Sequence, residues 1–269
     1  MRIALGVEYD GTAFNGWQRQ PAARTVQAQI EAALTGIANE AIGVTCAGRT
    51  DSGVHACHQV VHFDTQAERS NRSWVLGCNA NMPADVSVLW AQPMPDHFHA
   101  RFSAVSRSYD YVICNRQSRP GLWHGKVSWQ CLPLDAGCMR EAAAYWFGEH
   151  DFSSFRAKGC QAPHPMRTVY DFAVTESAGF VVLSVTANAF LQHMVRNLAG
   201  VLIEIGLGRK PPLWAAEVLA CRQRERAGIT ASPTGLYLTA VRYAEEFALP
   251  APDQRKPQLP CYSGAAFEG

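Results

Sequence analysis

The sequence predicts an α+β protein made of two domains, and three observations support this fold class. The chain has 269 residues, of which 48% are hydrophobic and 17% are charged, and this is enough apolar material for the cores of one or two soluble domains. Short stretches with strand-like alternation are interleaved with stretches of helical spacing. In the N-terminal third these stretches follow the order β-α-β-β-α-β, which is that of a split βαβ, ferredoxin-like unit.

The N-terminal elements can be justified one by one. Residues 2–9 alternate and are rich in β-forming side chains, so they predict a strand. Thr25 is a suitable N-cap, and apolar positions recur after it at helical spacing, which predicts a helix to about Asn39. The remaining elements of this half are a strand at 42–47, a strand at 58–64, a helix at 72–81 that Pro83 ends, and a strand at 86–90.

A segment rich in Pro and His, residues 91–103, is the expected domain boundary. We therefore expect an N-terminal α+β domain over residues 1–103 and a C-terminal α+β domain over 104–247. The Pro-rich sequence from 248 to 269 lacks periodicity and predicts a loosely ordered tail. The second domain is expected to contain a strand at 108–115, a helix at 134–147, a hairpin of strands at 167–176 and 180–188, helices at 192–206 and 212–222, and a strand at 236–243.

Charge indicates a nucleic-acid partner only locally. The formal net charge is +1, but Arg outnumbers Lys by twenty to four. The stretches 101–126 and 156–167 contain mostly basic residues among their charged side chains. Because Arg suits bidentate phosphate contacts and stacking on bases, these stretches predict a track for phosphates. A general codon preference for Arg is the alternative explanation of the composition.

Composition also bears on location. No apolar run approaches the ~20 residues that a membrane-spanning helix needs. The nine Cys are scattered and form no Cys-x-x-Cys pair, which predicts reduced thiols rather than a disulfide framework. We therefore expect a cytoplasmic protein with no membrane partner.

One short loop, Gly48–Ala56, concentrates side chains that can do chemistry. It holds Arg49, Asp51 and His55 between two apolar stretches, with a glycine on either side of the carboxylate. Polar loops held on rigid scaffolds often carry functional sites. Asp51 is therefore the leading candidate for a nucleophilic or ion-pairing carboxylate. The alternative is a turn residue that hydrogen-bonds its own backbone.

The same loop resembles the signature of the tRNA pseudouridine synthase A family. Four further segments match motifs of this family in the same order and rough spacing, so the resemblance runs from about Ile3 to Tyr243. These segments are Tyr9–Gln18, Asp151–Arg156, Phe190–Asn197 and Pro233–Leu238. The few departures, at Ser52, Met82 and Gln192, remove no group with an expected role.

The resemblance implies both a fold and an activity. The implied fold has two ferredoxin-like, RRM-like α+β subdomains whose antiparallel sheets join around a central active-site cleft. The implied activity is that of an isomerase that converts uridine to pseudouridine at positions 38–40 of the tRNA anticodon stem-loop. The family works as a homodimer, and no cofactor is expected because the reaction involves no redox change.

The resemblance also assigns roles to residues. Asp51 stands where the family has its catalytic aspartate, which either attacks C1′ as a nucleophile or supports a glycal-type elimination. Arg196 is expected against Asp51, where a nearby cation lowers the pKa of a carboxyl group. Tyr109 matches the active-site tyrosine, whose ring can stack on uracil and whose hydroxyl can assist proton transfer. Arg49 is expected to help hold the target base out of its stack.

Each of these residues could instead have a purely structural role. The resemblance suggests that Leu236, Tyr237 and Leu238 line the uracil pocket, whereas a last strand of this kind can equally belong to the core. Without the family match, Arg196 would be a surface helix residue and Tyr109 an ordinary strand aromatic.

Other chemistries fit the residues less well. The nearby His55, His58, His62 and Cys57 invite a metal site, but no second ligand pair has zinc-type spacing, so no metal is expected. Ser52 lacks the spacing of a hydrolase nucleophile elbow.

Two rival functions use the same residues differently. A catalytically inactive RNA-binding protein of the same fold would be expected to lack Asp51 or Arg196, and both are present. A glycoside hydrolase-like enzyme acting on a nucleoside needs a second carboxylate, and no matching motif supplies one.

Overall fold

The computed structural model describes residues 1–251, so most of the predicted loose tail lies outside the described residues. The described chain forms two compact units. Among the described residues, unit 1 consists of Met1–Arg107 together with residues 237–251, and unit 2 consists of Ser108–Leu236. The predicted strand at 236–243 thus falls almost wholly in unit 1 rather than in a C-terminal domain, because it pairs with a strand of unit 1.

Unit 1 contains the ferredoxin-like sheet. Its central strand β1 (Arg2–Tyr9) lies between β4 (Val86–Met94) and β3 (His55–Asp64), and it is antiparallel to both. Strand β2 (Thr45–Cys46) pairs with β3, which gives the order β4-β1-β3-β2. This is the order that a split βαβ unit requires. Strand β10 (Leu236–Tyr243) joins the start of β3 in parallel.

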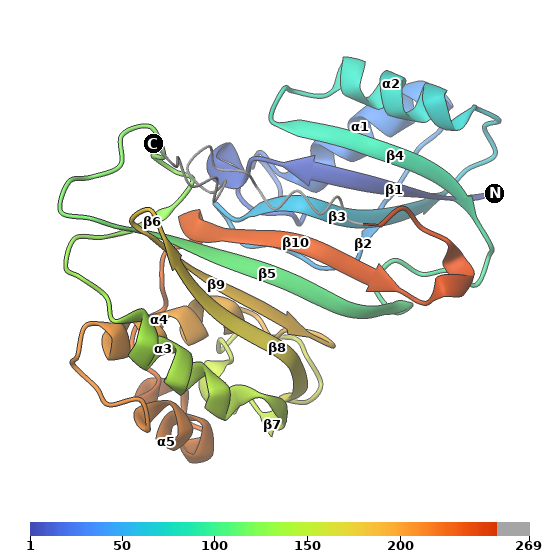
Figure 1. Ribbon diagram of the computed structural model, residues 1–269. Coiled ribbons are helices and arrows are strands. Elements are labelled where there is room, and N and C mark those ends of the chain that lie inside the picture. The colour runs from blue at the N-terminus through green and yellow to red at the C-terminus, as the bar shows by residue number, and fades with distance from the viewer. Residues whose placement is uncertain (252–269) are drawn as a thin grey trace, which may run out of the picture. The chain divides into compact units, whose positions relative to one another are not determined.

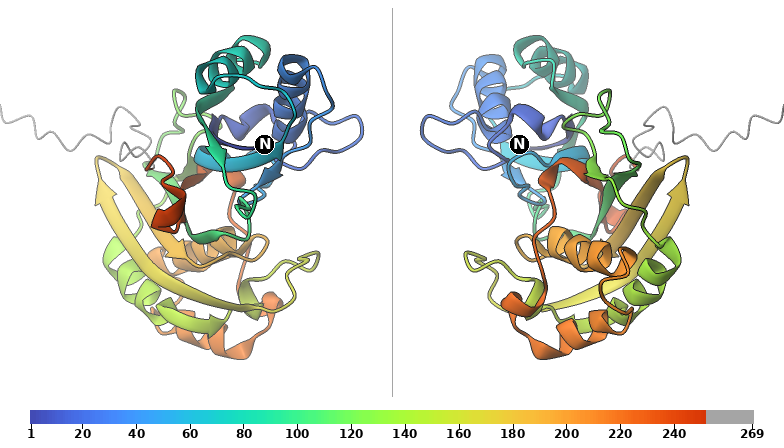
Figure 2. Two further views of the ribbon diagram at one scale, coloured as in Figure 1. Left: turned by 90° about the vertical axis from the view of Figure 1, so that its right-hand side faces the viewer. Right: turned by 90° about the vertical axis from the view of Figure 1, so that its left-hand side faces the viewer.

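Two helices cover one face of this sheet, as Figure 1 and Figure 2 show: α1 (Val26–Ala38) and α2 (Asn71–Asn81). Ile30 of α1 is fully buried, as the apolar spacing after Thr25 predicts, and Trp74 of α2 is fully buried as well. The Trp74 ring packs edge-on against Phe63 of β3, with 5.3 Å between ring centroids. The core of unit 1 therefore lies between the helices and the sheet.

The predicted strand at 42–47 is much shorter in the structure, where only β2 pairs. Ile42 and Val44 are buried, but their N–H groups donate to side chains of α1. Their acceptors are Thr35 Oγ1 and Glu31 Oε1, each at 3.1 Å. A buried N–H needs a partner but does not need a strand to supply it, so alternation predicted burial without predicting pairing.

Unit 2 has four strands in the order β5 (Ala104–Asn115, which begins in unit 1), β9 (Phe180–Ala187), β8 (Met166–Ser177) and β7 (Gly148–Asp151). The predicted hairpin of β8 and β9 turns through Ala178 and Gly179, which both have positive φ, as a type I′ turn requires. The short strand β6 (Ser128–Gln130) runs parallel to β5. The sequence predicts neither β6 nor β7, because three or four residues carry too little alternation to detect.

Three helices complete unit 2 (Figure 1): α3 (Ala136–Ala143), α4 (Met194–Gly206) and α5 (Trp214–Cys221). They pack against one another, and α3 also packs against β8. The predicted helix at 134–147 is observed as α3 followed by a 3-10 turn at Ala144–Trp146, and the chain then starts β7 at Gly148, where φ is +93°. The α+β class is thus confirmed in both units.

Two helical glycines give a matched stability test. Gly36 lies on the exposed side of α1, with nothing within 4 Å of the place a Cβ would take, whereas a Cβ on Gly200 in α4 would lie 2.0 Å from Ile229 O. Gly36→Ala should stabilise the protein by about 0.5–1 kcal/mol through its helix propensity. Gly200→Ala should destabilise it by more than about 1 kcal/mol, because backbone must move. Urea unfolding of both variants tests this, and equal stabilities would contradict the close packing at Gly200.

Candidate active site

The loop that carries Asp51 connects β2 to β3 in unit 1, and its start is tied to β3. Ala47 N–H donates to Val60 O at 2.8 Å. The buried Gln59 side chain then bonds both backbone groups of Gly48, donating to its carbonyl at 2.6 Å and accepting its N–H at 3.3 Å. The loop therefore leaves the sheet in one defined direction.

The motif segment Tyr9–Gln18 is hydrogen-bonded to this loop. Trp17 N–H donates to Thr50 O at 3.0 Å, and Gly53 N–H donates to Phe14 O at 3.3 Å. A Cβ on Gly16 would lie 2.8 Å from Thr50 O, and the φ of Gly16 is +84°. Only glycine fits this contact without strain, so two motifs that lie far apart in the sequence form one structural feature.

A buried hydroxyl pair holds the residue directly before Asp51. Tyr9 Oη and Thr50 Oγ1 are 2.7 Å apart, and both residues are buried. On the other side of Asp51, the carbonyl of Asp51 accepts the N–H of Val54 at 3.1 Å, and Gly53 has a φ of +78°. The backbone of Asp51 is thus fixed from both sides, which is the preorganisation that a catalytic group needs.

Strand β10 brings two of the predicted pocket residues to this loop. Tyr237 pairs with His55, and Leu238 pairs with Ala56. The Tyr237 and His55 rings stack with 4.6 Å between centroids and 18° between planes. Burial raises the pKa of Tyr237 well above its ordinary value, so its hydroxyl stays protonated. Both residues are buried, as the core interpretation also expects.

Arg49 lies in the same loop, and its charge influences the thiol of Cys46. Its positive charge lowers the pKa of Cys46, although burial dominates and raises that pKa to about 12. Cys46 is therefore a neutral thiol. Within unit 1 the structure thus gathers Arg49, Asp51, Tyr237 and Leu238 around the start of β3.

The other predicted residues lie in unit 2. Tyr109 is a buried residue of β5, and its ring meets Phe190 edge-on at 5.0 Å between centroids. Arg196 lies in the first turn of α4, where its Nε donates to Ala231 O at 2.9 Å. Leu236, the first residue of β10, is buried. The expected approach of Tyr109 and Arg196 to Asp51 remains a prediction from the family resemblance.

A buried polar network lies beside Arg196, and the sequence did not predict it. Asn197 is fully buried, and its Nδ2 donates to Phe155 O at 2.8 Å. Its Oδ1 accepts hydrogen bonds from Arg224 Nη2 at 2.9 Å and from Thr230 Oγ1 at 2.7 Å. The only signal for it was the Asn at the end of the Phe190–Asn197 motif. The network joins three segments of unit 2 where α4 begins.

The three histidines of β3 are backbone acceptors in the structure. Nδ1 of each ring accepts one N–H from a different segment: His55 from Gly11 at 3.1 Å, His58 from Val241 at 3.4 Å and His62 from Ala100 at 3.1 Å. For His58 and His62, an accepting Nδ1 requires the neutral ring tautomer with its proton on Nε2. Nδ1 of His55 also lies 3.2 Å from Oδ1 of Asp10. Within residues 1–251, no group of three or more potential ligands is placed to hold a metal ion.

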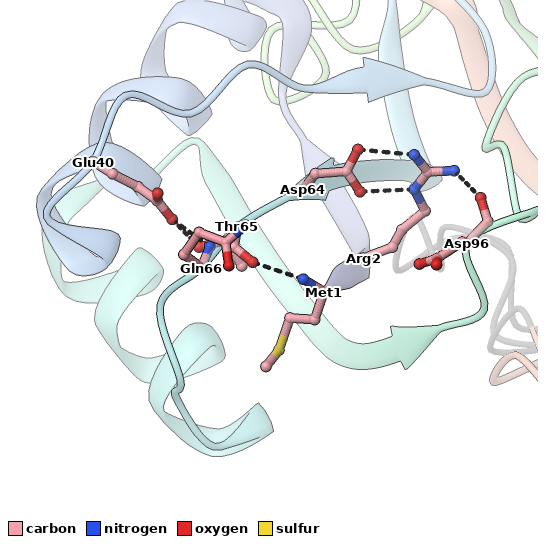
Figure 3. A pocket seen from close by; sticks show the side chains of 7 residues that line it. All are labelled: Met1, Arg2, Glu40, Asp64, Thr65, Gln66 and Asp96. Carbon is pink, nitrogen blue, oxygen red and sulfur yellow. Dashed lines mark hydrogen bonds and ion pairs between the residues drawn. The ribbon is translucent and has the colours of Figure 1, made fainter.

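A separate hollow of about 390 Å³ lies in unit 1 and contains none of the predicted site residues (Figure 3). Its charged groups bond to one another and to the backbone. Arg2 makes a bidentate ion pair with Asp64, with contacts of 2.8 and 2.9 Å, and Glu40 accepts hydrogen bonds from Thr65 and from Gln66 N–H. Arg2, Asp64 and Glu40 are therefore each engaged with neighbours that line the same hollow.

Comparison with known proteins agrees with the motifs. A profile of the family described as tRNA pseudouridine synthase matches residues 6–103 and 142–244. The chain is 56% identical over 250 residues to tRNA pseudouridine synthase A of Nitrosococcus oceani. The aligned region covers 93% of this chain and 96% of that protein. Identity to the proteins of the same name is 54% in both Alcanivorax borkumensis (93% and 94% covered) and Pseudomonas aeruginosa (93% and 88% covered).

Among solved structures, a chain of "Crystal Structure of a Cbf5-Nop10-Gar1 Complex" matches 87% of this chain and 57% of its own length at 14% identity. The TM-score of 0.33 is too low to establish a shared fold.

These matches define the chain first as an RNA-modifying isomerase of the pseudouridine synthase class. More narrowly, it belongs to the tRNA pseudouridine synthase family, and its curated relatives are of the A type. Among the described helices, none has the length and apolar character needed to cross a bilayer.

The Tyr9–Thr50 pair makes a testable prediction about Asp51. Tyr9→Phe and Thr50→Val each remove one hydroxyl, and each should lower the single-turnover rate at saturating RNA by about tenfold or more, because a small misplacement of a reacting group is costly. The double variant should lose little more than either single one, since the two changes break one bond. Ser154→Ala is the control, because it removes a buried bond to Val218 O elsewhere. Additive losses, or an equal loss in the control, would contradict the positioning role.

His62 predicts how stability changes with pH. Burial, helped by the charge of Arg2, lowers its pKa to about 4. The unfolded chain therefore binds more protons than the folded protein below about pH 6.5, and stability should fall from there toward pH 4. In His62→Asn the amide oxygen can still accept the Ala100 N–H but cannot titrate, so its urea midpoint should fall less steeply. Parallel curves for the two proteins would assign the pH dependence to other groups.

Proposed function

We propose that this chain isomerises uridine to pseudouridine at positions 38–40 of the tRNA anticodon stem-loop, with Asp51 as the acting carboxylate. Membership of the tRNA pseudouridine synthase family supports the reaction and the tRNA substrate. The observation that carries the role of Asp51 is the fixation of its backbone by the Tyr9–Gln18 segment. A surface turn residue would not require such extensive support.

The chemistry suits a carboxylate. The C1′–N1 bond breaks, the uracil turns, and a C1′–C5 bond forms. The C5 proton then leaves, and N1 gains a proton, so the reaction is balanced without an oxidant or a reductant. Departure of the base leaves C1′ electron-poor. Asp51 either bonds to C1′, or it takes the C2′ proton as a glycal forms and returns that proton to C2′ when the C1′–C5 bond is made. Both routes use the same residue.

The remaining site residues take supporting roles in this proposal. Arg196, braced by Ala231, would keep Asp51 ionised as a nearby cation does. Tyr109 would stack on the uracil and assist proton transfer. Arg49 would help hold the base out of its stack, and the start of β10, from Leu236 to Leu238, would line the uracil pocket.

The family resemblance supports the wider setting. We propose that catalysis uses side chains of both units, with Asp51 in unit 1 and Tyr109 and Arg196 in unit 2. The enzyme would act as a homodimer in the cytoplasm, with one protomer gripping the tRNA elbow while it presents the stem-loop to the other. It would need neither metal nor cofactor.

Replacing Asp51 tests the proposal directly. Asp51→Asn should lower turnover by about three orders of magnitude or more, while tRNA affinity stays near that of the wild type, because phosphate contacts dominate RNA binding. Tritium release from tRNA labelled at uridine C5 measures turnover, and mapping of pseudouridine in the product shows whether positions 38–40 are modified. Asp96→Asn, which changes an exposed carboxylate of the same unit, should behave as the wild type.

The outcomes separate the parts of the proposal. Appreciable release by Asp51→Asn would remove Asp51 from its role. Release by the wild type with pseudouridine outside positions 38–40 would keep the reaction and overturn the target. No release by the wild type would favour the inactive RNA-binding protein.

A further inference from the structure

Arg224 lies in the short 3-10 turn Arg224–Arg226 of unit 2 and has no role in the proposed reaction. Its half-buried guanidinium donates to three neutral acceptors. Nη1 donates to Gly228 O at 2.8 Å, and Nη2 donates to Thr230 Oγ1 at 2.7 Å and to Asn197 Oδ1 at 2.9 Å. Burial lowers the pKa of Arg224. Because a charge withdrawn from water is costly unless it is hydrogen-bonded, these bonds define where the surrounding groups must lie.

The hydrogen bonds of this network run in one direction. Arg has donors and no acceptor, so Thr230 Oγ1 accepts from Arg224 and gives its own proton to Asn197 Oδ1, which is 2.7 Å away. The same oxygen of Asn197 accepts from Arg224, which fixes the orientation of the amide and lets Nδ2 donate to Phe155 O at 2.8 Å. The guanidinium therefore orders both the hydroxyl and the amide.

The segment at residues 229–231 lies directly against α4. A Cβ on Gly200 would lie 2.0 Å from Ile229 O, so the helix and the segment meet at their backbones. One helical turn earlier, Ala231 N–H donates to the carbonyl of Arg196 at 3.1 Å. Residues four apart share one face of a helix, so this segment runs along the face of α4 that includes Arg196.

The same segment holds the side chain of Arg196. Its Nε donates to Ala231 O at 2.9 Å, so the two residues are bonded once through the backbone and once through a side chain. A guanidinium is planar and rigid, and a bond at Nε therefore restricts the direction in which its two Nη groups point. Since Thr230 precedes Ala231 and Asn197 follows Arg196, Arg224 bridges the two neighbours of this bonded pair.

We propose that Arg224 is a positioning residue for Arg196: by ordering Thr230 and Asn197 it fixes the backbone that aims the Arg196 guanidinium. This inference rests on the proposed function, in which Arg196 supports the carboxylate of Asp51, and it adds a residue that acts through Arg196 rather than on the RNA. A displacement of about 1 Å can cost about 100-fold in rate, so bonds one residue away from Arg196 matter for catalysis.

Single-turnover rates at saturating tRNA, with the Kd for tRNA measured in parallel, test this role. Arg224→Gln should lower the rate by about 10- to 100-fold and leave the Kd unchanged, because it displaces Arg196 without removing a contact with the RNA. Thr230→Val removes one hydroxyl and should also lower the rate, whereas Thr230→Ser keeps that hydroxyl and should stay near the wild type. Arg226→Gln, which changes an exposed arginine of the same turn, is the matched control and should keep both values.

A second background separates positioning from general damage to the fold. Arg196→Lys keeps the positive charge but lacks the guanidinium that Ala231 orients. If Arg224 acts through Arg196, Arg224→Gln should cause little further loss of rate in this background. The same loss in both backgrounds would overturn the proposal. A weaker Kd with an unchanged rate would overturn it in favour of a phosphate contact by Arg224.

An NMR readout without turnover keeps the two proposals apart. In protein made with isotope-labelled arginine, the Nε–H resonance of Arg196, assigned by its absence in Arg196→Lys, reports the bond to Ala231. It should shift and exchange faster with water in Arg224→Gln and in Thr230→Val, but not in Arg226→Gln. An unchanged resonance in Thr230→Val would overturn the proposal even where Arg224→Gln fails to fold. A wild type that forms no pseudouridine, combined with these spectral changes, would sink the proposed function and leave the positioning of Arg196 standing.

Discussion

The site in unit 1 depends on the contact between the Tyr9–Gln18 segment and the loop of Asp51. Gly16 lies so close to Thr50 O that no side chain fits there, and the hydroxyl of Tyr9 reaches that of Thr50 at 2.7 Å. A carboxylate on a surface loop would ordinarily sample many positions. Here the backbone on both sides of Asp51 is bonded to the segment that follows β1, through Trp17 on one side and Phe14 on the other. Chemistry at C1′ needs a group held in this way.

Buried polar side chains connect the functional loops to the scaffold. His62, Arg107 and Asn197 each bond the backbone of at least one segment distant in sequence. A buried polar group left without a partner costs more than the net gain of one hydrogen bond, so each of these residues favours a single arrangement of the segments it joins. The loops can then remain irregular and polar without becoming mobile.

Much of the fold and part of the site could be predicted from local patterns. Strand β10 lies where alternation predicts it, and α1 follows its expected N-cap Thr25. The predicted strand at 42–47 was wrong over most of its length, because the N–H groups of Ile42 and Val44 donate to side chains of α1 instead of to a neighbouring strand. The network around Asn197 could not be found, because its partners Arg224 and Thr230 are isolated in sequence and nothing local marks them.

By itself, the sequence determined the α+β class, the order of elements in unit 1 and the family, because these follow from periodicity and from motifs read along the chain. Tertiary structure alone decided that β10 returns to pair with β3, that three histidines serve as backbone acceptors, and that Arg107 bonds the backbone of both Arg101 and Ala47. Each of these depends on contacts between residues far apart in the chain. Local propensity carries no information about such partners, since they are chosen by packing and by the need to satisfy buried polar groups.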